Sequence, residues 1–112
     1  MDNLFTDLPP LHAVDETFQQ LLARSGLRIE RIVSSGQASA PDFWYDQPQG
    51  EWVLLVQGEA GLRFADEAEL RHLKAGDYVD IAPHRRHRVE WTSRDPVTIW
   101  LAVHYDPRLT EG

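Results

Sequence analysis

The sequence predicts an all-β protein, an antiparallel barrel or sandwich preceded by one short N-terminal helix. From Leu27 onward, apolar and polar residues alternate or apolar residues form brief runs, which is the pattern of β-strands. Turn residues such as Gly76-Asp77 and Asp95-Pro96 separate these segments at close intervals. About eight short strands at this spacing are typical of a barrel or sandwich rather than of alternating strands and helices.

A helical pattern lies near the N-terminus. Residues 1–13 contain Pro9-Pro10 and are expected to form an irregular arm. Asp15 can then cap a helix, and Ser25-Gly26 can end it. Between them, apolar residues recur at helical spacing, at Val14, Phe18, Leu21 and Leu22. We therefore expect a helix at about 15–24 that covers one side or one mouth of the barrel.

The remaining chain is expected to form one domain, because 112 residues can bury one core but not two. This domain covers residues 14–112, and its barrel covers about 27–105. The predicted strands are 27–34, 43–45, 51–57, 61–65, 69–73, 78–82, 87–92 and 97–105.

Charge and composition exclude several classes of function. The chain has 11 basic and 18 acidic residues, for a formal net charge of −7. Such a surface repels phosphate groups, so we expect neither nucleic acid nor membrane as a partner. The absence of cysteine excludes disulfides, thiolate metal sites and a cysteine nucleophile. With no secretory signal pattern and no apolar stretch near 20 residues, a cytoplasmic protein is expected.

Two segments resemble the conserved motifs of the cupin superfamily. In the first, Glu51 and Gly58 keep the family's spacing from glutamate to glycine. In the second, Gly76 and His87 keep the family's offset from glycine to a metal-binding histidine. The resemblance covers roughly residues 36–105 and is to small, single-domain cupins of type 2. It implies an antiparallel double-stranded β-helix, the jelly-roll barrel of RmlC-like cupins, with a divalent metal near His87.

The first motif departs from the family because its His-x-His pair is absent. The two positions fall on Trp44 and Asp46 or on Tyr45 and Gln47, depending on the gap to Glu51. The candidate metal ligands are therefore His87 and Glu51, completed by some of Asp46, Gln47, His84 and His104. Oxygen and imidazole ligands without thiolate suit Fe, Mn, Ni or Zn.

Two functions are consistent with these residues. The first is a metal-dependent enzyme acting on a small molecule, such as a dioxygenase, isomerase or lyase. The second is a non-catalytic cupin that binds or senses a small ligand, with Glu51 and His87 forming a metal-free pair. His84 is otherwise a solvated loop residue, and His104 a surface or interface residue. We also expect a homodimer, because small cupins commonly pair and exposed sheet edges need covering.

Overall fold

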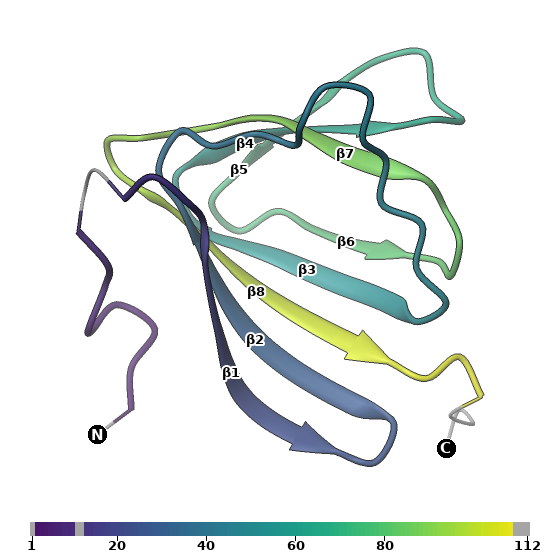
Figure 1. Ribbon diagram of the computed structural model, residues 1–112, viewed down its shortest axis with the longest axis horizontal. Helices are drawn as coiled ribbons and strands as arrows, with labels where there is room; N and C mark the ends of the chain where they lie inside the picture. The colour runs from purple at the N-terminus through teal and green to yellow at the C-terminus, as the bar shows by residue number, and fades with distance from the viewer. Residues whose placement is uncertain (1, 11–12, 109–112) are drawn as a thin grey trace.

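The computed structural model describes residues 2–10 and 13–108, and within these ranges it contains strands and no helix (Figure 1). The strands are β1 (Thr17–Arg24), β2 (Leu27–Ser34), β3 (Gly50–Gln57), β4 (Glu59–Phe64), β5 (Arg71–Lys74), β6 (Tyr78–Ile81), β7 (His87–Thr92) and β8 (Thr98–Tyr105). The all-β prediction is confirmed. The predicted arm and domain include Met1, Leu11, His12 and 109–112, which lie outside the described residues. No helix suited to crossing a membrane occurs in the described ranges.

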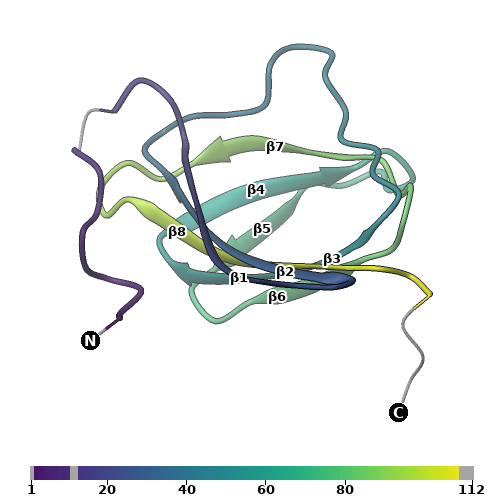
Figure 2. The ribbon, with the colours of Figure 1, turned by 60° about the horizontal axis from the view of Figure 1, so that its bottom comes forward.

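The strands form two antiparallel sheets that face each other, as Figure 2 shows. The larger sheet has the order β1-β2-β8-β3-β6, and the smaller has the order β5-β4-β7. Strands far apart in sequence are therefore neighbours, with β8 inserted between β2 and β3. This is the double-stranded β-helix that the sequence motifs imply.

The predicted helix at 15–24 is wrong, because residues Thr17–Arg24 form the edge strand β1. The chain turns at Ser25 and Gly26, with Gly26 at φ 78°, and β1 pairs with β2 along its whole length. A register shift between Gln20 and Leu22 inserts an extra residue and disturbs the two-residue alternation of β1. That bulge gave the apolar residues a spacing that resembles a helix.

The core lies between the two sheets and follows the alternation of the strands. Its buried cluster takes side chains from both sheets, among them Leu55 of β3, Phe64 of β4 and Ala102 of β8. Leu55, Phe64 and Ala102 are fully inaccessible to solvent. Burying apolar surface at about 25 cal/mol per Å² provides the main stabilisation of such a barrel. The same inward alternation places Glu51 at one end of β3 and His87 at one end of β7.

Three positions of the two cupin-like motifs have left-handed backbone. Gly58 and Gly76, the motif glycines, have φ of +88° and +97° at the turns after β3 and before β6. A side chain is strained at such φ, so glycine suits both turns. His84 has φ +62° and stands where the family motif usually has glycine. The backbone at His84 therefore keeps the left-handed conformation although histidine bears a side chain.

The N-terminal arm is fixed to the larger sheet through Arg31 of β2. This guanidinium is buried and donates hydrogen bonds to the backbone oxygens of Leu4, Thr6 and Asp7 at 3.1, 2.7 and 3.2 Å. The three carbonyl oxygens solvate two nitrogens of the guanidinium, whereas its buried Nε has no hydrogen-bond partner among the described residues. The arm therefore packs on the face of the sheet that Arg31 presents, which is opposite to the face carrying Glu30.

Candidate functional site

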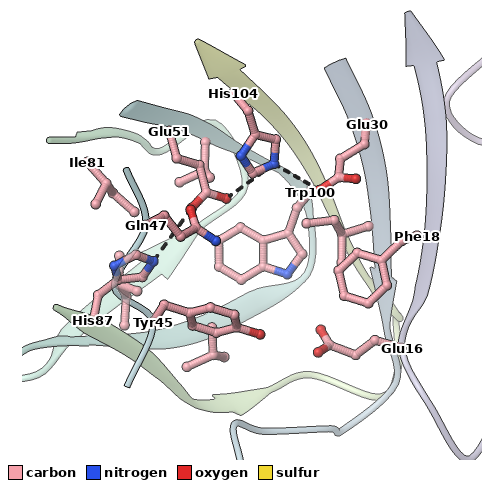
Figure 3. A pocket seen from close by; sticks show the side chains of 14 residues that line it. Glu16, Phe18, Glu30, Tyr45, Gln47, Glu51, Ile81, His87, Trp100 and His104 are labelled. Atoms are coloured by element: carbon pink, nitrogen blue, oxygen red, sulfur yellow. Dashed lines mark hydrogen bonds and ion pairs between the residues drawn. The ribbon is translucent and has the colours of Figure 1, made fainter. Parts of the chain in front are cut away.

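A pocket of about 100 Å³ opens between the sheets, with acidic, imidazole and aromatic side chains around it (Figure 3). Its ionisable lining comes from four of the strands and from the segments that precede β1 and β3, namely Glu16, Glu30, Tyr45, Glu51, His87 and His104. Core residues such as Val53, Ile81 and Val89 form its apolar floor. A concave, mostly apolar space with a few convergent polar groups is the usual form of a small-molecule site.

His87 is held in one orientation at the start of β7. It is 6% exposed, and its Nδ1 lies 2.8 Å from the backbone oxygen of Arg85. Because a carbonyl oxygen only accepts, Nδ1 must carry the hydrogen and donate it. In a neutral ring this leaves the lone pair on Nε2, which faces Oε1 of Glu51 at 3.6 Å. A metal-ligating histidine is commonly fixed in this way.

Glu51 lies between two imidazoles near the start of β3. Its Oε1 is 3.6 Å from Nε2 of His87, and its Oε2 is 4.0 Å from Nε2 of His104. Both distances are too long for hydrogen bonds. Glu51 is only 9% exposed, so its carboxylate needs a compensating group. The His87–Glu51 side of the pocket therefore holds a buried acceptor without a close donor.

His104 is buried in the pocket wall, whereas the sequence interpretation put it at a surface or interface. Its Nε2 lies 2.9 Å from Oε1 of Glu30 on the neighbouring strand β2, two residues along from Arg28, which is directly opposite His104. Since a carboxylate accepts, Nε2 of His104 carries the hydrogen. The alternation of β8 groups His104 with Trp100 and Ala102, and only the packing of the sheets shows that this face is inward.

The conformation of the segment before β3 decides which of its candidate ligands line the pocket. Tyr45 pairs with His87 through two backbone hydrogen bonds of 2.8 and 3.2 Å, and His84 donates its backbone N–H to the oxygen of Gln47 at 2.7 Å. The predicted strand 43–45 is thus reduced to one bridge. In this extended segment Tyr45 and Gln47 line the pocket, and the intervening Asp46 does not.

Asp46 and His84 pair with each other outside the pocket. Nδ1 of His84 lies 2.7 Å from Oδ1 of Asp46, and both side chains are at least half exposed. The pocket therefore brings together His87, Glu51, Gln47 and His104 of the candidate ligands and leaves Asp46 and His84 outside. Oε1 of Gln47 is buried and accepts no hydrogen bond from the described residues. Across the same ranges, no three histidine, aspartate or glutamate side chains form a metal-ligand group.

The pKa of the Tyr45 hydroxyl is affected by the charges around the pocket. Its ring stacks on His87 at 5.4 Å between centroids and 21° between planes. Burial raises the pKa of the Tyr45 hydroxyl above its usual value, and the charges of Glu16 and Glu51 raise it further. A tyrosinate here would be desolvated and repelled by two carboxylates. The pocket therefore disfavours negative charge.

Comparisons with solved structures identify similar proteins. A candidate mannose-6-phosphate isomerase of Ralstonia eutropha JMP134 is 52% identical, with a TM-score of 0.91 over 95% of this chain and 97% of that one. An RmlC-like cupin of Shewanella frigidimarina is 19% identical, with a TM-score of 0.66 over 84% and 78%. An RmlC-like cupin of Methanocaldococcus jannaschii is 15% identical, with a TM-score of 0.66 over 85% and 84%. No family model and no curated protein matches the chain.

Proposed function

This chain belongs to the cupin superfamily, and we propose that its pocket binds one divalent metal ion together with a small molecule. The observation that carries the proposal is a set of electron-pair donors gathered without a hydrogen between them. Nε2 of His87 faces Oε1 of Glu51 at 3.6 Å, and the same pocket is lined by Gln47, whose buried Oε1 accepts no hydrogen bond from the described residues (Figure 3). A cation compensates such a set.

The donors fit a divalent ion. Two ligands of one ion, each about 2.1 Å from it, lie about 3 to 4 Å apart, which includes the His87–Glu51 separation. One imidazole nitrogen with carboxylate and amide oxygens suits Fe, Mn, Ni or Zn. The backbone oxygen of Arg85 orients the His87 ring for this role. Tyr45 and Gln47 stand at the positions of the missing His-x-His pair. Of these two residues, only Gln47 offers a side-chain amide oxygen, so the two positions provide at most one such ligand.

A bound ion would supply Lewis-acid activation of the small molecule. The chain itself offers a proton donor and a proton acceptor beside it, because Nε2–H of His104 is hydrogen-bonded to Glu30 at 2.9 Å. Such a pair suits reactions that move a proton on a bound molecule. The name of the Ralstonia protein favours an isomerase among the proposed reaction types, with lyase and dioxygenase as the others.

Metal analysis of untagged protein, purified without added metal and after loading, tests the proposal. We expect stoichiometric Fe, Mn, Ni or Zn in the wild type and at least about tenfold less in Glu51→Ala and His87→Ala. The matched controls are Asp46→Ala and His84→Ala, which remove the same kinds of group from the exposed pair. Folded wild-type protein that holds no metal at any loading would contradict it.

The second candidate is a non-catalytic cupin that binds or senses a small ligand without metal. It is favoured by the lack of three converging histidine, aspartate or glutamate side chains in the described ranges. Here Glu51 and His87 form a buried pair with no metal between them. Ligand binding that persists unchanged after treatment with a chelator supports this function, and binding that is lost supports the metal site.

We also propose a homodimer. The edge strand β1 and the residues before it expose large apolar side chains, including Val14 and Leu21 at 87% and 44%. An open strand edge with apolar side chains favours association. Sedimentation at micromolar concentration tests this proposal, and a monomer would contradict it.

A further inference from the structure

The pocket carries acidic groups without a basic side chain of the lysine or arginine type. Three carboxylates line it, from Glu16, Glu30 and Glu51, whereas its lining within the described chain includes no lysine or arginine. Neighbouring arginines are engaged elsewhere, because Arg85 pairs with Asp66 and Glu67. A phosphorylated sugar needs cationic or N–H donors for its phosphate, and this space offers carboxylates instead. The described side chains of this pocket therefore offer a phosphate group no cationic partner of the lysine or arginine type.

Three aromatic rings of the described residues line the pocket, with Tyr45 stacked on His87 and with Phe18 and Trp100 toward the side of Glu16. Figure 3 shows the rings of Phe18, Tyr45 and Trp100 around this space, with Glu16 on the same side. These rings come from β1, from the segment before β3 and from β8, so the fold assembles them. Faces of aromatic rings attract cations, and cages of such rings bind quaternary ammonium groups.

The carboxylates of Glu16 and Glu30, which line the pocket, keep oxygen atoms available for a ligand. Glu16 accepts a hydrogen bond from the Ser34 hydroxyl through Oε2, and Glu30 accepts one from His104 through Oε1. A carboxylate has about four acceptor positions, so each group retains capacity for a further partner.

We propose that the small molecule carries an alkylammonium group, bound among Phe18, Tyr45 and Trp100 and beside Glu16. The rest of the molecule then extends toward Glu51 and His87. This inference rests on the proposed function, because it names the ligand class of the same pocket. A cavity of about 150 Å³ admits a molecule the size of benzene, so a pocket of about 100 Å³ admits a methylated ammonium group.

Titrations followed by the indole N–H signal of Trp100 in NMR spectra test the proposal with three probes at constant ionic strength. The probes are tetramethylammonium, the neutral and similarly shaped tert-butanol, and mannose 6-phosphate. We expect tetramethylammonium to bind about tenfold more tightly than tert-butanol, in line with a desolvated cation–π site. Mannose 6-phosphate should cause no saturable shift.

Variants locate the effect. Glu16→Gln and Phe18→Ala should each weaken tetramethylammonium binding about fivefold. Glu69→Gln and Phe5→Ala make the same chemical changes at exposed positions and should leave binding unchanged. Phe18 is 57% exposed, so its truncation leaves the fold intact.

Failure of this inference is distinct from failure of the metal proposal. Preferential binding of mannose 6-phosphate, equal binding of the ammonium and alcohol probes, or no saturable shift with tetramethylammonium would each overturn the ammonium site. The metal content of the same samples is measured in parallel. Protein that holds metal but does not bind tetramethylammonium overturns only the ammonium site. Protein that holds no metal at any loading but binds tetramethylammonium overturns only the metal site.

Discussion

The protein contains two carboxylate–imidazole pairs of similar composition in very different surroundings. Asp46 and His84 are 2.7 Å apart, with side chains 50% and 67% exposed. Glu51 and His87 are 3.6 Å apart, with side chains only 11% and 7% exposed. The shorter contact is satisfied in water and contributes little, whereas the longer one is desolvated and incomplete. Burial, rather than distance, therefore marks the site.

The two pairs are close in sequence and are separated by the direction of their side chains. The extended segment before β3 alternates, so Asp46 points away from the pocket that Tyr45 and Gln47 line. In the turn before β7, the backbone at His84 is left-handed. The His84 side chain is exposed, whereas His87, three residues later, faces inward. Two residues of the same type thus acquire different roles.

The largest expected difference concerns removal of one partner from each pair. His87→Ala should lower the free energy of unfolding by about 3 kcal/mol, because it leaves a cavity in the pocket wall and removes the imidazole beside the buried Glu51 carboxylate. His84→Ala should change it by less than about 0.5 kcal/mol. Urea denaturation in the presence of a chelator measures both values. Similar losses for the two variants would show that burial does not distinguish the pairs.

A smaller effect is expected when both buried partners become apolar. The double variant Glu51→Met/His87→Leu should unfold within about 1 kcal/mol of the wild type, because it removes the desolvated groups together. The same urea experiment measures it, with Glu51→Met alone as the control for an imidazole left without its partner. A loss as large as that of His87→Ala would mean that the ionic pair itself stabilises the barrel.

The smallest effect concerns a third polar pair, between β8 and β6. Here the Tyr105 hydroxyl donates a hydrogen bond to Oδ1 of Asp80 at 2.5 Å. This hydrogen bond, and secondly burial, raise the pKa of Tyr105 from 10.0 to about 12. Because the folded-state pKa is the higher one, the stabilisation is complete below pH 10 and is lost as the pH rises toward 12.

Thermal unfolding of Tyr105→Phe between pH 9 and pH 12 measures this contribution. We expect the variant to melt about 2 °C below the wild type at pH 9, with the difference closing toward pH 12. Tyr78→Phe, which removes the hydroxyl of a tyrosine that is 67% exposed, is the control and should show no such closure. A constant difference for Tyr105→Phe would contradict the assignment of the shift to Asp80.

The strand pattern of the barrel was predictable because alternation and turns are local properties. The predicted bounds of 27–34 and 87–92 coincide with β2 and β7. The N-terminal strand was not predictable, because its bulge disturbed the alternation and pairing with β2 decided its conformation. Local apolar spacing cannot distinguish a short helix from a bulged edge strand when the pairing partner follows in the chain.

The sequence by itself determined the double-stranded β-helix and the turn glycines Gly58 and Gly76, and it singled out Glu51 and His87 as candidate site residues, because these depend on residue type and spacing. Only the tertiary structure decided that Gln47 and His104 face the pocket while Asp46 and His84 pair outside it. The physical reason is that alternation defines two faces of a strand, but the packing of one sheet against the other decides which face is buried.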